Sequence, residues 1–274
     1  MAYTNFKPEI WSHKIQHDLP KFTVFEQDCN YQFKGEVKQG ATVHILGVGR
    51  PTIGDYNGSS IGSPEVLEGT KQTLVIDQAK YFNFGVDDVD EAQSIPGLME
   101  AYMEESTRAM AEQRDSFIAK LASGATHAST STTISTKANA KAAIDAAITA
   151  LISQGVKLGR DNVTMYLNPE VWMLIADYII ETKSKNDQAL ATGVLGNYMG
   201  VKIKVSNNIY NDGTDDYLMV KTDKAIAFAS NINKVEAYRP ENLFMDAVKG
   251  LNCYGGKIVR PNELYVIKHK IART

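Results

Sequence analysis

The chain has 274 residues, of which 43% are hydrophobic and 22% charged, so it can bury the core of one large domain or two ordinary ones. Its 29 basic residues against 32 acidic residues give a formal net charge of −3, which argues against a surface built to grip nucleic acid phosphates or anionic lipid. The two cysteines, Cys29 and Cys253, match neither a zinc-binding spacing nor the disulfide framework of a secreted domain, so we expect free thiols in a reducing compartment.

The N-terminal stretch is unlike a targeting signal. Residues 1–19 are interrupted by charged and histidine side chains, which excludes a signal peptide, and no apolar run in the sequence is long enough to cross a membrane. We therefore expect a protein that is made and kept soluble in the cytoplasm. Residues 1–35 carry isolated large apolar side chains among charges, without the period of a helix or a strand. This pattern predicts an arm laid over another surface, although a partly frayed terminus fits it equally well.

Two strand-like stretches follow, at residues 41–48 and 73–86. The stretch between them, residues 49–70, is rich in Gly, Ser, Pro and Asp and forms a long polar tip. A two-stranded ribbon with such a tip cannot stabilise itself in water. We therefore expect the ribbon to project from the body of the molecule and to pack on a neighbouring molecule.

Residues 97–122 have apolar side chains at helical spacing and predict a helix on the order of 40 Å long. The segment from Asp87 to Asp115 contains nine acidic residues, and only Arg108 and Arg114 oppose them. One face of this helix is therefore expected to be solvated or paired with a basic partner. The acidic residues are Asp87, Asp88, Asp90, Glu91, Glu100, Glu104, Glu105, Glu112 and Asp115.

After a Ser/Thr/Ala-rich linker at residues 123–136 the pattern changes to a mixed α/β unit, and we place a domain boundary there. A second helix of this unit is expected to be capped by Asn168, with Pro169 in its first turn. The predicted elements are a helix at 138–153, a strand at 163–167, the helix after Asn168, short strands at 201–205, 217–220 and 225–228, and strand-like segments at 234–238, 242–259 and 263–271.

Two glycine-containing motifs match functional patterns without the structural context that those patterns need. Residues 58–62 fit G-x-S-x-G, yet the serine lies in the polar tip, without the apolar helix that a nucleophile elbow enters. Residues 47–49 offer two glycines of a phosphate-binding loop, but Pro51 follows them and no helix N-terminus is available to receive an anion. We interpret the first as a loop that fits a loose pattern and the second as a bend or bulge in the ribbon.

The candidate metal ligands are the acidic set Asp87, Asp88, Asp90 and Glu91 and the pair His13 and His17. The acidic set does not follow the spacing of a calcium loop, and a charged approach to the helix or a salt-bridge patch between subunits fits it better. The histidine pair has the four-residue spacing of helical zinc ligands, but it lacks a third ligand and a glutamate base. Neither set predicts a metal site.

The remaining candidates for acid–base or nucleic acid chemistry are His44, His127 and a basic C-terminal set of Lys268, His269, Lys270 and Arg273. The first two have no evident partner for general base chemistry. The basic set is interpreted as a solvated strand edge rather than a nucleic acid site. We therefore assign no catalytic, cofactor-binding or metal-binding residue.

Four segments carry a resemblance to a known family over nearly the whole chain. They are GATVHILGVGRPTIGDY at 40–56, LVIDQAKYFNFGVDDVDEAQS at 74–94, GLMEAYMEESTRAMAEQRDSFIAKLA at 97–122 and NLFMDAVKGLNCYGGKIVRPNEL at 242–264. The chain resembles the major capsid proteins of tailed bacteriophages, with the Hong Kong 97-like fold. The resemblance implies an α+β protein with an N-terminal arm (1–35), an extended β-hairpin loop (36–88), a peripheral domain with a long spine helix (89–130 and 233–258) and a mixed α/β axial domain (131–232 and 259–274).

The same resemblance implies a function. A protein of this kind self-assembles through pentamers and hexamers into an icosahedral shell around phage double-stranded DNA, and it resides in the virion after assembly in the host cytoplasm. The expected partners are further copies of the chain, a portal protein, a separate scaffolding protein if Met1 is the true start, and an optional decoration protein. Contact with packaged DNA is expected to be weak and non-specific, and no membrane is involved.

One departure from the family concerns covalent linkage. Some relatives join subunits by a lysine-to-asparagine isopeptide bond through a lysine near the tip of the extended loop. No lysine lies between Lys38 and Lys71 in this chain, so we predict a shell held by non-covalent contacts. Two alternative functions stay open, the shell of an encapsulin-like protein compartment and, from a different class, a cytoplasmic α/β enzyme.

Overall fold

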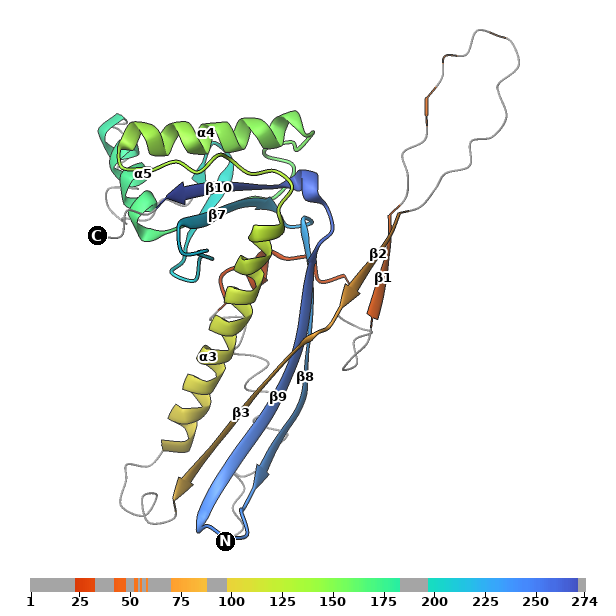
Figure 1. The fold of residues 1–274 in the computed structure, drawn as a ribbon, viewed down its shortest axis with the longest axis vertical. Helices are drawn as coiled ribbons and strands as arrows, with labels where there is room; N and C mark the ends of the chain where they lie inside the picture. The colour runs from red at the N-terminus through yellow and green to blue at the C-terminus, as the bar shows by residue number, and fades with distance from the viewer. Residues whose placement is uncertain are drawn as a thin grey trace.

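The computed structural model describes residues 23–32, 42–47, 52–53, 55, 58, 70–87, 98–182 and 197–270. Figure 1 shows three parts: an upper part of helices and short strands, a long lower part in which a helix lies along a narrow sheet, and a two-stranded ribbon that leaves the body at one side. Among the described helices, none is both long and apolar enough to span a membrane.

The upper part contains a five-stranded sheet in the order β10-β7-β4-β6-β5, in which β4 and β6 are parallel and the other neighbours antiparallel. Its elements are α4 (Lys137–Ser153), β4 (Val163–Leu167), α5 (Pro169–Thr182), β5 (Asn197–Tyr198), β6 (Val201–Val205), β7 (Asp215–Thr222) and β10 (Leu264–Lys270). All five residues of β4 are buried, because Val163, Met165 and Leu167 face a core shared with α4 and α5 while Tyr166 faces a second core.

The predicted start of α5 is confirmed, and α4 begins at Lys137, one residue before its predicted start. The hydroxyl of Thr136 accepts a hydrogen bond from the backbone N–H of Asn139 at the start of α4. The side-chain oxygen of Asn168 accepts one from the N–H of Val171 at 2.9 Å, and Pro169 is the first residue of α5. Both side chains satisfy N–H groups that a helix cannot pair internally.

The lower part is a three-stranded antiparallel sheet in the order β3-β9-β8, covered by the helix α3. The elements are β3 (Gln78–Asp87), α3 (Leu98–Leu121), β8 (Ile226–Tyr238) and β9 (Met245–Ile258). The 24 residues of α3 correspond to about 36 Å, which confirms the predicted long helix. Phe82 and Phe84 of the sheet pack with Met103 of α3. Gly250 is required beside them, because a Cβ at this position would overlap the ring of Phe82.

The prediction of one continuous strand over residues 73–86 is wrong, since two strands occupy this stretch. β2 (Thr70–Val75) pairs with β1 (Thr42–Gly47), whereas β3 pairs with β9 along its whole length. At the break, Ile76 turns into a small core, and the backbone of Val75 passes so close to Gly255 that no side chain would fit there. The stretch from Asp77 to Lys80 contains no glycine or proline that would mark a break, so the sequence pattern does not show that the partner strand changes.

Two further sequence interpretations also change. The segments predicted separately at 225–228 and 234–238 form the single strand β8, which has an irregularity between Ile232 and Lys234. The linker at 123–136 runs along the outer edge of β10 and exchanges backbone hydrogen bonds with it through His127, Ser129 and Thr132. The linker therefore covers the edge of the sheet that the basic C-terminal set was expected to expose.

Within that basic set, His269 is buried rather than solvated. Its Nδ1 accepts a hydrogen bond from the N–H of Ile134 at 3.2 Å, which places the proton of a neutral ring on Nε2. Lys268 lies over the ring of Tyr217, with its Nζ 5.3 Å from the ring centroid. Lys270 is exposed, and Arg273 lies outside the described residues.

Candidate functional site

The short motifs identified in the sequence do not form a common site in the described part of the chain. No group of three or more metal-binding side chains occurs among the residues that the structure describes. His127 is half-buried, and one of its ring nitrogens lies 3.2 Å from the side-chain oxygen of Asn262. Of the G-x-S-x-G motif only Gly58 is described. His13, His17, Asp88, Asp90, Glu91 and the side chains of His44 and Asp87 lie outside the described residues.

Instead, the most elaborate polar arrangement surrounds residues 23–32, within the stretch expected to form an N-terminal arm. The single helical turn η1 (Glu26–Asp28) lies where the upper and lower parts meet. Phe25 is fully buried and stacks on Tyr166 of β4, with ring centroids 4.3 Å apart. Asn30 exchanges backbone hydrogen bonds with β8 through Ile226 and Phe228. This part of the chain packs on the chain itself; residues 1–22 and 33–35 lie outside the described residues.

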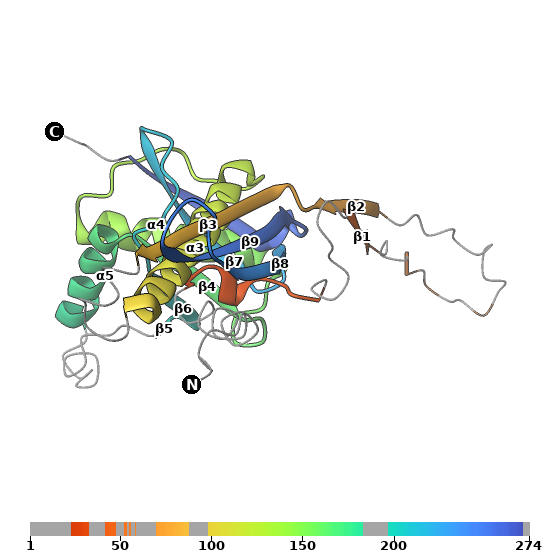
Figure 2. The same ribbon diagram turned by 90° about the horizontal axis from the view of Figure 1, so that it is seen from below.

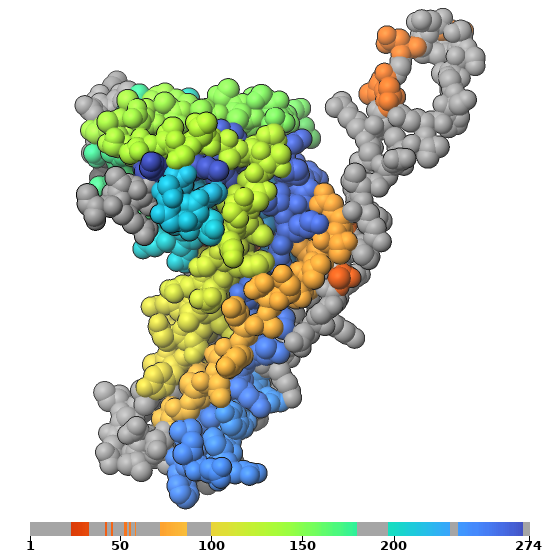
Figure 3. Space-filling model, in the orientation of Figure 1, coloured from red at the N-terminus to blue at the C-terminus, as the bar shows by residue number. Residues whose placement is uncertain are grey.

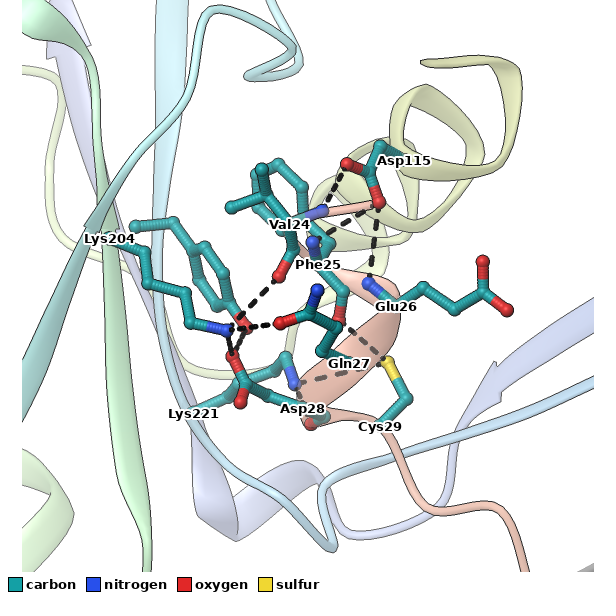
Figure 4. Close-up of polar contacts among 10 residues, drawn as sticks. Val24, Phe25, Glu26, Gln27, Asp28, Cys29, Asp115, Lys204 and Lys221 are labelled. Carbon is teal, nitrogen blue, oxygen red and sulfur yellow. Dashed lines mark hydrogen bonds and ion pairs between the residues drawn. The ribbon is translucent and has the colours of Figure 1, made fainter. Parts of the chain in front are cut away.

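A carboxylate from α3 holds the start of this turn. The backbone N–H groups of Val24, Phe25 and Glu26 donate to Asp115 at 2.6, 3.1 and 3.3 Å, as Figure 4 shows. Asp115 thus does for η1 what a capping side chain does for a helix, although it is about 90 residues away in sequence. Burial raises the pKa of Asp115 to about 6, in spite of the three N–H donors that lower it.

The residue before it in α3, Arg114, forms a buried ion pair with the same turn. Its guanidinium donates to the carboxylate of Glu26 at 2.9 Å and to the side-chain oxygen of Asn252 in β9 at 2.7 Å. The side chains of Arg114 and Glu26 are only 4% and 5% exposed. The expectation that the charges of α3 lie on one solvated face is therefore wrong for Arg114 and Asp115, which are internal.

The other end of the turn is fastened to the upper sheet. The carboxylate of Asp28 accepts a hydrogen bond from the Tyr166 hydroxyl at 2.6 Å and pairs with Lys204 of β6 at 2.7 Å. Lys221 of β7, which is fully buried, donates to the backbone carbonyl of Asp28. Its Nζ also lies 3.9 Å from the sulfur of Cys29. We call the turn and these partners the arm anchor; it ties α3 to the upper sheet (Figure 4).

The arm anchor is suited to holding chain segments together and poorly suited to catalysis. Burial raises the pKa of the Cys29 thiol to about 11, although the nearby Lys221 ammonium lowers it, so the thiol stays protonated near neutral pH. Burial also raises the pKa of Tyr166 well above its usual value. Neither group is placed or activated as a nucleophile.

The sequence contains one signal for the arm anchor, in the position of Arg114 on α3, which composition alone does not reveal. Met103, Met110 and Ile118 mark the buried stripe of α3, and Arg114 falls on the same stripe at helical spacing. A charge on an apolar stripe indicates a buried partner. The partner itself, Glu26, cannot be found this way, because it lies 88 residues away in a segment without a regular period.

The remaining acids of α3 agree with the predicted solvated face. Glu100, Glu104, Glu105 and Glu112 are exposed. Arg108 lies 3.8 Å from Glu104 and 3.9 Å from Glu105, and all three side chains are about half exposed or more. Pairs of this kind contribute at most about 1 kcal/mol each.

Comparisons with known proteins identify the family. A sequence model described as Phage capsid protein matches residues 70–267. A solved structure from Mycobacterium phage Che8 is 31% identical, covers 89% of this chain and 90% of its own, and superposes with a TM-score of 0.75. The chain belongs to the phage capsid protein family. A search among curated protein sequences finds no match.

More distant structures show the same fold in other capsid proteins and shells. The capsid structure of the cyanophage P-SCSP1u is 15% identical over 90% of this chain and 88% of that one, with a TM-score of 0.72. A virus-like particle from Pyrococcus furiosus is 12% identical over 94% and 98%, with a TM-score of 0.60. The predicted α+β, Hong Kong 97-like capsid fold is confirmed, and the chain is a major capsid protein that forms an icosahedral shell.

Proposed function

We propose that this capsid protein assembles through pentamers and hexamers, that the resulting shell encloses double-stranded phage DNA, and that non-covalent contacts hold the subunits together. The observation that carries the proposal is the ribbon. In the part of the chain that the structure describes, β1 pairs with β2 alone, and two-stranded ribbons of this kind are marginal in water. Figure 2 shows it directed away from α3 and the long sheet. A neighbouring subunit supplies the surface that such a ribbon needs.

The chemistry of the chain supports non-covalent contacts and loose contact with DNA. The ribbon tip contains no lysine between Lys38 and Lys71, so the nucleophile of an isopeptide bond is missing there. The net charge of −3 disfavours the counterion release that tight DNA binding requires. A weakly interacting inner wall would let packaged DNA slide.

We propose the domain division implied by the family: an arm at 1–35, an extended loop at 36–88, a peripheral domain at 89–130 and 233–258, and an axial domain at 131–232 and 259–274. Two segments depart from this division, because residues 78–87 pair with β9 and residues 226–232 lie in β8, and we assign both segments to the peripheral domain. We also propose a separate scaffolding protein, a portal protein, a decoration protein on some shells, assembly in the host cytoplasm, and a purely structural role without enzymatic activity.

Electron microscopy of the purified chain, alone and with a co-expressed candidate scaffold, tests this function. We expect closed icosahedral particles, and stable monomers under every condition would contradict the proposal. On a denaturing gel, particles loaded without boiling should release only the 30.2 kDa chain, whereas a covalent ladder would contradict non-covalent assembly. Particles from infected cells should contain DNA; protein cargo without DNA would instead favour the compartment shell.

A further inference from the structure

The linker between α3 and α4 is held on the edge of β10 by a row of hydrogen bonds. Backbone groups of His127, Ser129 and Thr132 bond to those of β10, and the Ser129 hydroxyl accepts one more from the N–H of Lys268 at 2.9 Å. Figure 3 shows the linker, in yellow-green, on the surface of the upper part, with little of β10, in dark blue, visible beneath it. Because the linker joins α3 to α4, these bonds also fix how the chain passes from the lower part to the upper part.

The last bond of the row differs from the others in its acceptor. The N–H of Ile134 donates to Nδ1 of His269 at 3.2 Å, whereas the acceptors before it are carbonyl and hydroxyl oxygens. His269 is 4% exposed, and Ile134, at 5%, belongs to the core shared by α4 and α5. A ring nitrogen accepts such a bond only while it carries no proton. The end of the linker thus depends on the protonation state of one buried side chain.

Asp216 is the charged group that lies beside this ring. It stands opposite His269 in the register of β7 and β10, on the same face of the sheet, and it is buried. Its two carboxylate oxygens accept hydrogen bonds from the side-chain amides of Asn168 and Asn211, at 3.0 and 2.8 Å. A protonated ring has two N–H donors and no acceptor, and the Asp216 carboxylate is an acceptor towards which it can turn.

The remaining charged and histidine side chains of the elements packed on β10 have other positions or partners. Lys268 and Lys270 lie on the opposite face of β10, because side chains alternate along a strand, and Asp215 and Lys221 of β7 alternate in the same way. Residues 128–136 of the linker contain no ionisable side chain. The others pair with one another or with a neutral side chain: Lys137 with Asp177, Lys141 with Asp145, Arg260 with Glu263, and His127 with Asn262.

We propose that His269 is a pH-sensitive latch that holds the end of the linker on β10. The neutral ring accepts from Ile134 and keeps the latch closed. A protonated ring presents an N–H to the N–H of Ile134, so the bond is lost and residues 132–134 detach from the strand. Histidine side chains change charge between about pH 5 and pH 8, so mild acid opens the latch. This inference is independent of the proposed shell function, because it concerns bonds within one subunit.

An open latch changes both the strand edge and the passage between the two parts. Thr132 exchanges two backbone hydrogen bonds with β10, through the carbonyl of Lys268 and the N–H of Lys270. When the linker detaches, these groups become free to pair with another chain. The path from α3 to α4 also loses a constraint, so the upper part gains freedom relative to α3.

Hydrogen exchange of the full, unassembled chain at pH 7 and pH 5 tests the latch. The quantity compared is the protection factor, which corrects for the intrinsic effect of pH on exchange. We expect the protection of the Ile134 and Thr132 amides to fall about tenfold between pH 7 and pH 5. The amide of Trp172, which donates to the carbonyl of Asn168 within α5, should keep its protection. Unchanged protection of Ile134 would overturn the proposal.

A matched pair of variants identifies the titrating group. His269→Asn supplies an acceptor that does not titrate, because its side-chain oxygen can occupy the position of Nδ1. In this variant, we expect Ile134 to be equally protected at both pH values. His127→Asn makes the same change at the other histidine of this edge and should behave like the wild-type chain. A loss of protection in His269→Asn as large as that of the wild type would contradict the latch.

If His269→Asn does not fold, the ring of the wild-type chain decides. The nuclear magnetic resonance signal of the Cε1 proton of His269 should titrate over the same pH range in which Ile134 loses protection. A ring that stays neutral down to about pH 5, or a loss of protection at a different pH from the ring titration, would show that another group controls the linker.

Discussion

The arm anchor and the ribbon are both short segments at the margin of the molecule, and they are stabilised in opposite ways. The turn η1 brings Phe25 into the core and fastens its backbone through Asp115 and Lys221. The ribbon β1–β2 has buried side chains at Ile45 and Leu74, and it meets the body where β2 gives way to β3. A single subunit therefore completes the arm anchor by itself, whereas in the proposed assembly the ribbon gains further contacts from a neighbour.

This difference separates folding from assembly. Interactions that one subunit completes contribute to its own free energy of unfolding, and those left for neighbours contribute only in the shell. Shells gain their stability from many weak interfaces, and a weak contact can break and form again when a subunit is misplaced. A ribbon that is only marginally stable in the isolated subunit is consistent with such reversible assembly.

Breaking the arm anchor should have the largest effect. Arg114→Ala leaves the carboxylate of Glu26 buried without its cation and should lower the free energy of unfolding of the isolated subunit by about 3–5 kcal/mol. Urea denaturation measures this change. Arg108→Ala, in the same helix but half exposed, should change it by less than about 0.5 kcal/mol. Equal effects of the two substitutions would show that the buried pair has no special role.

At the base of the ribbon, burial changes from one residue to the next. Leu74 is fully buried, so Leu74→Ala should cost about 3 kcal/mol of subunit stability. Val75 is 49% exposed, and Val75→Ala should cost less than about 0.5 kcal/mol in the isolated subunit. The same denaturation experiment applies. A large loss for Val75→Ala would mean that the subunit itself covers the ribbon.

The arm anchor should also respond to pH. The native pKa of Asp115 is about 6, above its ordinary value of 3.8, so the native state binds a proton more tightly than the unfolded state. Stability contributed by this group is therefore highest at low pH and falls as the pH rises from about 4 to about 6, by on the order of 2 kcal/mol. Asp115→Asn should flatten this slope in denaturation curves at pH 4.5 and 7, and an unchanged slope would assign the pH dependence to other groups.

The smallest predicted effect tests a single hydrogen bond between the ribbon and the body. The side-chain amide of Gln72 donates to the carbonyl of Val259 at 3.2 Å. Gln72→Ala should cost about 1 kcal/mol. Gln113→Ala, at an exposed position of α3, should have no measurable effect on thermal unfolding. A loss above about 2 kcal/mol for Gln72→Ala would indicate that the ribbon is fastened more firmly than its contacts suggest.

Local sequence patterns predicted the elements that are defined by residues close together in the sequence. The stripes of α3 and α4 and the cap at Asn168 depend on neighbours three or four residues away, so their positions follow from the sequence. The change from β2 to β3 at Ile76 depends on which distant strand lies alongside. The local pattern of apolar and polar residues does not identify that partner strand. The arm anchor was missed for the same reason, since its bonds join residues about 90 positions apart.

The linker beside β10 has a consequence for a protein that must accumulate in many copies. An open strand edge on each subunit would allow sheets of different molecules to join through their backbones, and such joining grows into fibres. Residues 127–132 occupy the outer hydrogen-bonding groups of β10, so another chain cannot extend the sheet there. At high concentration, subunits therefore cannot join through the backbone of this edge and associate through side chains instead. The shape and charge of side-chain contacts can specify a closed particle.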